Sequence, residues 1–388
     1  MTVNFEFLGQ EPIENVITCM NYKMDKVVYF GYDDVIKEQR KHTEDFLKKH
    51  CGVETVSFFS MSRHDLKSVL KTMRAEIQRE LDRKNRIYFD VTGGESLILV
   101  VFGMLCKEFD TPMHSYNIEK NELIELNDGS SIKISKDGVV RKVQLTLDLL
   151  IEMRGGKINY NLHKGIKTNE DADFTKDVEK IYQVAQKNWN LWNPFSDFLR
   201  SSMYTVSENL TVNKPTAAVI QDLSEENAKL RKVADLNEML DELAAIGVLL
   251  DVEHSRERYA FRYKNQKIKD CLWEGGSILE MHTYQQESKQ SDECSVGVHL
   301  DWDGVIHPQW GVDVVNEIDV LSLKGNIPTF ISCKSGKMGS QQALHALYEL
   351  DTVTRRFGGK YAKKALVTAN GLTGAYQTRA EEMGIEVR

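Results

Sequence analysis

The sequence predicts an α/β protein of more than one domain, in which a parallel α/β domain precedes a mainly helical region and a second α/β region. The first observation is an alternation of strand-like and helix-like segments over the first 120 residues. The second is an amphipathic helix followed by a hairpin pattern near the middle. The third is a hairpin close to the C-terminus with helical patterns on both sides. At 388 residues, the chain is also too long for one typical core.

The N-terminal region has the pattern of a parallel sheet covered by helices. The expected strands are residues 3–8, 26–32, 53–59, 86–91 and 113–118, and the expected helices are residues 34–50, 64–84 and 95–109. This outline is Rossmann-like. Ligands are therefore expected beyond the carboxyl ends of the strands.

A short loop after the fourth expected strand is a candidate ligand site. It consists of Thr92, Gly93, Gly94, Glu95 and Ser96 and opens the next helix. Two glycines allow close backbone approach, and helix N–H groups at this point suit a phosphate or a ribose hydroxyl. The loop matches neither the G-x-G-x-x-G fingerprint nor a P-loop, so NAD binding and ATP hydrolysis are poorly supported. The structural alternative is an ordinary turn with a threonine cap.

The middle of the chain predicts a winged-helix-like region. Its expected elements are helices at 173–190, 194–203 and 224–246 and strands at 248–252 and 258–263. Trp189 and Trp192 are expected in the core between the first two helices. Such a region binds DNA or connects two lobes and relays movement between them, and we favour the connector. The polar stretch at 161–173 is expected to be a linker.

The hairpin near the C-terminus carries an acid and a lysine on neighbouring strands. Residues 318–323 and 329–333 are the expected strands. Asp319 lies on the first strand, and Lys334 ends the second, otherwise apolar strand. An acid beside this lysine could hold both it and a divalent cation near a phosphate, which indicates metal-assisted phosphodiester cleavage. The other interpretation is an exposed cross-strand ion pair of little energetic consequence.

Three further carboxylates are candidates for the same site. Glu280 lies in an expected helix upstream of the hairpin. Glu349 lies in the expected downstream helix at 340–357, on one polar line with His345. Glu317 is two residues from the strand acid and therefore faces the same side of the strand. For Glu349 and His345, a solvated helix face is the alternative.

The chemistry explains this choice of residues. Carboxylates suit Mg²⁺ or Mn²⁺, and no Cys/His zinc pattern competes with them. Such a cation would lower the pKa of a bound water and neutralise charge on the phosphate, while Lys334 would orient the nucleophile or stabilise the developing oxyanions.

Composition predicts a protein of the cell interior. The apolar fraction of 41% and the charged fraction of 28% are ordinary for a globular protein. Six cysteines are scattered without a CxxC motif, which favours the reducing cytoplasm. Neither a signal peptide nor a membrane span is expected. The net charge of −8 argues against indiscriminate attraction to nucleic acid, although residues 331–379 carry eight basic and two acidic residues.

The order of these C-terminal elements resembles the PD-(D/E)xK nuclease superfamily. In that superfamily a helical Glu, a strand Asp and an acid-x-Lys on the next strand bind metal and position water. The resemblance implies that Glu280 and Asp319 bind metal and that Lys334 is catalytic. Ser332 departs from the pattern, because it stands where many members carry the second strand acid.

The N-terminal loops resemble the CARF domain, the sensor of cyclic oligoadenylates in type III CRISPR defence. The matching residues are Gly9, Gln10 and Glu11 after the first strand, Thr92 to Ser96 after the fourth, and Asn117 after the fifth. Glu95 and Ser96 depart from relatives that often place a small polar residue and a lysine there. The order of domains over the whole chain looks like the CRISPR ancillary nucleases of the Can/Card group.

This resemblance implies a domain organisation. We expect a CARF-like Rossmann sensor domain at 1–145, a linker at 146–172, a winged-helix-like connector at 173–265 and a PD-(D/E)xK-like α/β nuclease domain at 266–388.

It also implies a function. A homodimer would form one symmetric pocket for a cyclic oligoadenylate, with cyclic tetra-adenylate as the expected ligand. Binding would activate a Mn²⁺- or Mg²⁺-dependent endonuclease that nicks duplex DNA or cuts single strands, with RNA as a further expected substrate. The alternative is a ligand-responsive winged-helix DNA-binding regulator with a degenerate nuclease domain. A third hypothesis is an unregulated restriction-type or repair nuclease.

Overall fold

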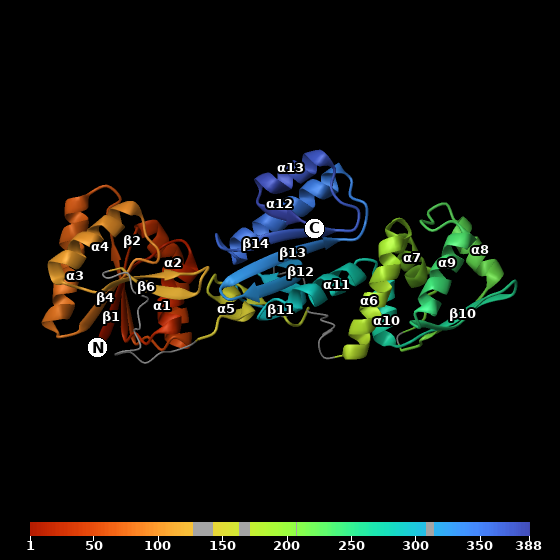
Figure 1. The fold of residues 1–388 in the computed structure, drawn as a ribbon, viewed down its shortest axis with the longest axis horizontal. Coiled ribbons are helices and arrows are strands. Elements are labelled where there is room, and N and C mark those ends of the chain that lie inside the picture. Colours follow the sequence, from red (N-terminus) through yellow and green to blue (C-terminus); the bar gives the residue numbers. More distant parts are fainter. Residues whose placement is uncertain (127–142, 163–170, 207, 308–313) are drawn as a thin grey trace.

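The computed structural model describes residues 1–126, 143–162, 171–206, 208–307 and 314–388. These residues form three lobes along one long axis (Figure 1). The N-terminal lobe lies at one end, the C-terminal lobe in the middle and a winged-helix-like lobe at the other end. Each lobe has its own sheet. None of the helices in the described ranges is long and apolar enough to cross a membrane.

The N-terminal lobe is a six-stranded sheet with helices on its faces. Its elements are β1 (Thr2–Phe7), α1 (Pro12–Asn21), β2 (Lys26–Gly31), α2 (Asp33–His50), β3 (Thr55–Ser60), α3 (Leu66–Asp82), β4 (Arg86–Asp90), α4 (Ser96–Phe109), β5 (Met113–Asn117) and β6 (Glu122–Glu125). The strand order is β3-β2-β1-β4-β5-β6, and only β6 runs antiparallel to its neighbour. The order changes direction between β1 and β4, so a ligand is expected beyond their carboxyl ends.

The C-terminal lobe has a mixed sheet. Its elements are α5 (Leu147–Glu152), β7 (Lys157–Ile158), α11 (Ser277–Ser288), β11 (Glu293–Asp301), β12 (Val315–Lys324), β13 (Ile327–Lys334), α12 (Ser340–Phe357), β14 (Lys363–Thr368), α13 (Gly374–Glu382) and β15 (Ile385–Val387). The order is β15-β14-β13-β12-β11-β7. Strands β13, β14 and β15 are parallel, and the remaining pairs are antiparallel.

The third lobe has the helix and hairpin order of a winged helix. Its elements are α6 (Ala172–Lys187), α7 (Trp189–Ser201), β8 (Thr211–Pro215), α8 (Thr216–Ser224), α9 (Val233–Ala245), β9 (Leu249–His254), β10 (Arg258–Tyr263) and α10 (Gln266–Trp273). The strands form the antiparallel order β8-β10-β9. Ser224 ends α8 and does not begin the long helix expected at 224–246. The predicted fold class, Rossmann-like, winged-helix-like and α/β, is confirmed.

The segment expected as a linker contains structure of its own. Residues 147–152 form α5, whose Leu147, Leu150 and Ile151 are buried. Residues 157–158 form β7, in which Ile158 pairs with Leu300 of β11 at the edge of the C-terminal sheet. These apolar residues are buried against strands that lie far away in the sequence, so the local polar pattern did not predict their structure.

The winged-helix-like lobe does not connect the other two lobes. It is inserted in the chain between β7 and α11, and the C-terminal lobe separates it from the N-terminal lobe (Figure 1). The expectation of a connector between sensor and nuclease is wrong for this reason. The chain joins the central sheet at β7, leaves it to form the winged-helix-like lobe, and then returns to form the rest of the C-terminal lobe. The order of the lobes in space therefore differs from their order along the chain.

Two hydrophobic cores hold the three lobes together. One includes Phe5 of the N-terminal lobe and Phe330 of β13. The other includes Trp192 of the winged-helix-like lobe and Ile331 of β13. Successive strand residues point to opposite faces of a sheet, so the central sheet contributes one face to each core.

Candidate active site and sensor site

Asp319 lies where β12 and β13 separate. The paired register of these strands runs from Lys324↔Ile327 to Val320↔Ile331 and goes no further. Beyond it, Oδ2 of Asp319 accepts a hydrogen bond of 2.6 Å from the backbone N–H of Cys333. The carboxylate therefore satisfies a backbone N–H that the neighbouring strand leaves unpaired.

Lys334 accompanies Asp319 at this opening. Its Nζ lies 3.7 Å from Oδ2 of Asp319. The lysine side chain is 36% exposed and that of Asp319 16% exposed, so the acid is shielded while the ammonium remains accessible from solvent. A partly exposed pair of this kind contributes little to stability. Its position at the end of two diverging strands favours a role in binding.

Glu280 reaches the same region from α11. Burial, together with the charges of Asp319 and Glu317, raises the pKa of Glu280 to about 8, while Lys334 acts in the opposite direction. A carboxyl that is difficult to ionise among other carboxylates favours a nearby cation. The structure therefore brings Glu280, Asp319, Glu317 and Lys334 together.

The helix that carries Glu280 is held from two sides. Thr283 accepts a hydrogen bond from Sγ of Cys333 at 3.6 Å, which joins α11 to β13. One residue before it, His282 stacks on Tyr182 of α6 with the ring centroids 3.5 Å apart. Packing against both the sheet and the winged-helix-like lobe fixes the position of the Glu280 backbone.

A cavity of about 740 Å³ opens beside Lys334. Its wall includes Lys334, Lys337, Gln341, His345 and Glu349, mostly from α12 and the loop before it. Oε2 of Glu349 lies 3.6 Å from Nδ1 of His345. Two carboxylates are thus candidates for a further ligand. Glu349 lines the same cavity as Lys334. Glu317 lies close enough for its charge to raise the pKa of Glu280.

The carboxylates fit a hydrated divalent cation. Among the described residues, no group of three or more His, Cys, Asp or Glu side chains is arranged to hold a metal by itself. Mg²⁺ keeps several waters and is usually held by one or two carboxylates together with substrate phosphates. Glu280 and Asp319 meet that requirement. Metal binding at this site, and the identity of the metal, stay predictions.

The candidate sensor loops meet at the carboxyl edge of the N-terminal sheet. Asp90 accepts hydrogen bonds from the backbone N–H of Thr92 at 2.9 Å and from its hydroxyl at 2.5 Å. The Thr92 hydroxyl in turn accepts the backbone N–H of Tyr116 at 2.8 Å, which ties the loop after β4 to β5. Gly9 is held through both backbone polar groups by the Asn15 amide at 2.9 Å. These contacts make the edge rigid.

The remaining candidates differ in accessibility. Gln10, Gly94, Glu95 and Ser96 are exposed, and Gly93 is buried. Asn117 is half-buried, and its side-chain oxygen accepts the backbone N–H of Lys120 at 2.9 Å.

Two residues at this edge were not foreseen from the sequence. The hydroxyl of Tyr32, which follows β2, donates to Glu95 at 3.0 Å. Arg63, which follows β3, lies 4.2 Å from the centroid of the Tyr32 ring. Their positions directly after parallel strands are the signal that would have identified them. Arg63 places a guanidinium near the loop that lacks the lysine found in relatives, and this guanidinium is paired with Asp34 at 2.9 Å.

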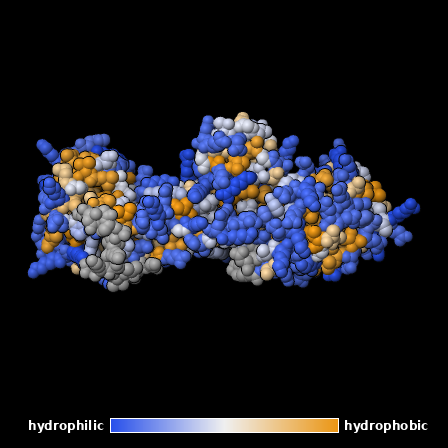
Figure 2. Space-filling view, in the orientation of Figure 1, coloured by the Kyte–Doolittle hydropathy of each residue, from blue (hydrophilic) through white to orange (hydrophobic). Residues whose placement is uncertain are grey.

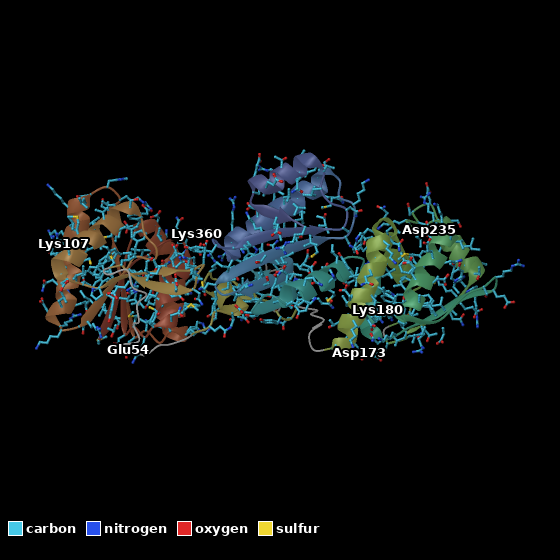
Figure 3. The ribbon with its side chains drawn as sticks, viewed as in Figure 1. Glu54, Lys107, Asp173, Lys180, Asp235 and Lys360 are labelled. Carbon is cyan, nitrogen blue, oxygen red and sulfur yellow. The ribbon has the colours of Figure 1, made fainter. Side chains whose placement is uncertain are left out.

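Glu11 is directed toward the C-terminal lobe. It forms an ion pair with Arg154, and its Oε2 accepts the backbone N–H of Lys360 at 2.9 Å. Lys360 lies at the boundary between the two lobes in Figure 3. The Glu11 carboxylate is thus occupied by contacts with the neighbouring lobe. The ligand-binding role expected for Glu11 stays a prediction.

The sequence matches no family model, and a search of curated proteins finds no relative. Among solved structures, the protein VC1899 from Vibrio cholerae has a TM-score of 0.68 at 16% identity, covering 100% of this chain and 93% of that one.

A second similar structure is Can2 from Sulfobacillus thermosulfidooxidans in complex with cyclic tetra-adenylate. Its TM-score is 0.65 at 15% identity, and the match covers 100% of this chain and 93% of that chain. At these identities the similarity establishes a common fold over the whole chain.

Proposed function

We propose that this protein is a nuclease of type III CRISPR defence, activated by a cyclic oligoadenylate and dependent on a divalent cation, that acts in the cytoplasm on DNA and as a further substrate on RNA. The observation that carries the proposal is Asp319 at the divergence of two strands, 3.7 Å from Lys334 and close to Glu280. The fold shared with Can2, a protein solved with cyclic tetra-adenylate, supports it.

Each residue of the site has a distinct task. Glu280 and Asp319 would hold Mg²⁺ or Mn²⁺, with Glu317 or Glu349 as a further ligand. When bound, such a cation lowers the pKa of a water and neutralises charge on the phosphate. Lys334 presents an ammonium to the phosphate oxygens on which charge develops during cleavage.

The sensor edge suits an anionic ligand. The Thr92 loop precedes the N-terminus of α4, where free N–H groups and the helix dipole favour a phosphate. Arg63 adds a guanidinium near the same edge. We expect cyclic tetra-adenylate to bind there and to activate the nuclease by binding the active arrangement more tightly than the resting one.

The exposed face of α4 supports the proposal of a homodimer. Leu99, Val100 and Met104 are 36%, 56% and 47% exposed, and with the exposed Gly103 they form an apolar stripe. Hydrophobic surface is visible on the N-terminal lobe in Figure 2. Because α4 starts at the Thr92 loop, a two-fold axis parallel to α4 would place both loops at one end, where a symmetric ring can contact them equally.

The alternative of a DNA-binding regulator loses support from α9. This helix precedes the β9–β10 hairpin and would be the DNA-reading helix of a winged helix. Its sequence contains Asp235, Glu238, Asp241 and Glu242 and no lysine or arginine. Asp235 lies at the surface of its lobe in Figure 3. A helix that enters a DNA groove relies on basic residues, so this one is unsuited to the task.

The deciding experiment measures cleavage of supercoiled plasmid and of labelled single-stranded DNA and RNA. Reactions contain Mg²⁺ or Mn²⁺ with and without cyclic tetra- or hexa-adenylate. We expect cutting only when metal and one cyclic adenylate are both present. Lys334→Ala should lower the rate about a hundredfold or more while ligand binding persists. Wild-type cutting by Lys334→Ala or Asp319→Ala would contradict the assignment of the site.

A further inference from the structure

A second cavity of about 310 Å³ adjoins the one beside Lys334. The two cavities share Lys337 and Met338 in their walls. The second one is also lined by Asn190 at the start of α7, by Asn370 and Thr373 of the loop after β14, and by Tyr376 of α13. It therefore lies where the winged-helix-like lobe meets the C-terminal lobe.

The wall between the cavities is held at several points. The backbone N–H of Ala369 donates to the carbonyl of Lys334 at 3.0 Å. The Asn370 amide donates to the carbonyl of Ser335 at 3.3 Å. From the other lobe, Asn193 of α7 hydrogen-bonds the Ser335 hydroxyl at 3.1 Å. The distance between the second cavity and Lys334 is thus fixed by hydrogen bonds from both lobes, so one substrate can occupy both cavities in a defined register.

The lining suits an unpaired nucleobase. Tyr376 offers an aromatic side chain of the type on which bases stack. Asn190 and Asn370 are exposed, and their amides supply both donors and acceptors for the edge of a base. Lys337, which is exposed and shared by both cavities, is placed to contact the intervening phosphate. A volume of about 310 Å³ is at the lower end of ligand pockets and admits a single nucleotide but no duplex.

We propose that this cavity binds the unpaired base of a nucleotide next to the scissile phosphate, and that single-stranded nucleic acid is therefore the preferred substrate class. The proposal rests on the nuclease function proposed above. It adds a specificity site made by two lobes, outside the carboxylates and the lysine assigned to the reaction.

The test combines two substitutions with modified substrates. Tyr376→Ala removes the ring, whereas Tyr376→Phe keeps it and serves as the matched control. Single-stranded DNA with an abasic site at each position near the cut provides the complementary change. Steady-state cleavage with Mg²⁺ and cyclic tetra-adenylate gives KM and kcat. Fluorescence of an oligonucleotide with one 2-aminopurine, measured with Ca²⁺ in place of Mg²⁺, reports stacking without relying on turnover.

We expect Tyr376→Ala to raise KM for single strands about tenfold or more, with a smaller change in kcat. One abasic position should reproduce that change in wild type and have no further effect in Tyr376→Ala. The 2-aminopurine at that position should be quenched by wild type and Tyr376→Phe but not by Tyr376→Ala.

Two results would overturn the proposal while leaving the nuclease intact. One is cleavage by Tyr376→Ala with wild-type KM on every single strand. The other is cutting of duplex DNA as efficient as that of the same strand unpaired, with no abasic position affected. If wild type cuts neither DNA nor RNA under any condition, the proposed function itself fails, and that outcome is distinct from both results above.

Discussion

The hydroxyl of Ser332 donates a hydrogen bond of 3.1 Å to Oδ2 of Asp319. The same oxygen accepts the backbone N–H of Cys333 at 2.6 Å. Ser332 thus occupies the place of an expected metal-binding acid but orients the acid on the neighbouring strand. We therefore expect Ser332 to support Asp319 and not to bind a metal itself.

Removal of this support should weaken cleavage without abolishing it. Ser332→Ala leaves the bond from the Cys333 backbone in place and deletes one hydrogen bond, which typically contributes about 1 kcal/mol, or about a fivefold change in rate. Ser332→Thr keeps the hydroxyl and is the control. Initial rates on single-stranded DNA with Mn²⁺ and cyclic tetra-adenylate measure the effect. Equal rates for all three proteins would show that Ser332 does not position Asp319.

Glu14 should couple the sensor to the nuclease lobe. Its carboxylate is adjacent to Gly93 of the sensor loop and, on the other side, accepts the hydroxyl of Tyr361 at 2.6 Å and pairs with Lys360 at 2.5 Å. We expect Tyr361→Phe and Glu14→Gln to reduce activation by cyclic tetra-adenylate about five- to tenfold, because each removes roughly 1 kcal/mol of contact between the lobes.

The control for this coupling is Glu152→Gln. Glu152 also joins the N-terminal lobe, through Lys49 at 2.6 Å, but is 40% exposed and lies away from the sensor loop. Activation is measured as the ratio of cleavage rates with and without ligand, alongside the ligand Kd from calorimetry. If Tyr361→Phe responds to ligand as wild type does, the contact is structural only.

The buried Glu6 should make stability depend on pH. Burial, with additional contributions from Asp90 and Glu14, raises the pKa of Glu6 well above its ordinary value. Below an unfolded-state pKa of about 4.3, Glu6 is protonated in both states. As pH rises past that value, the unfolded chain loses the proton and the folded chain keeps it, so the free energy of unfolding falls.

Glu6→Gln should remove this dependence. The variant is expected to match wild type near pH 4 and to be more stable by about 1 kcal/mol at pH 7, since a neutral amide replaces a buried acid. Urea unfolding followed by circular dichroism at several pH values provides the measurement. Glu54→Gln, at an exposed position labelled in Figure 3, should behave as wild type. Parallel stability curves for wild type and Glu6→Gln would refute the prediction.

The apolar stripe on α4 should control dimerisation. A charge in Val100→Glu would be buried without a partner in each copy, so we expect the dimer Kd to rise at least tenfold and ligand affinity to fall with it. Val233→Glu, a substitution at a residue that is 38% exposed in the winged-helix-like lobe, is the matched control. Sedimentation equilibrium gives the dimer Kd. An unchanged Kd in Val100→Glu would place the dimer interface elsewhere.

The sequence predicted the N-terminal lobe closely because its central strands β1, β2 and β4 are continuous buried runs. Residues such as Val27, Val28 and Phe30 leave little ambiguity about an internal strand. The hairpin of the C-terminal lobe was predicted for a similar reason, since Gly325 marks the turn between two apolar strands.

Other features depend on contacts between distant parts of the chain. Lys157 and Ile158 become a strand only because β11 lies beside them, and two residues have no periodicity of their own. The same pairing determines which lobe lies in the middle. At the sensor edge, Arg63 and Tyr32 belong to different loops, and only the sheet order brings them together.

The division of the β13 side chains between two cores has a consequence for the independence of the lobes. Phe330 and Ile331 are both fully buried, yet they belong to different cores: Phe330 to the core shared with the N-terminal lobe and Ile331 to the core shared with the winged-helix-like lobe. A fragment cut at residues 266–388 keeps α11 and α12 on its sheet but loses the parts of both cores that the other two lobes supply, so it should be less stable than the same residues in the whole chain. The strands that carry Asp319 and Lys334 therefore share a core with each of the other lobes, and a destabilising substitution in either of those lobes should also lower the stability of these strands.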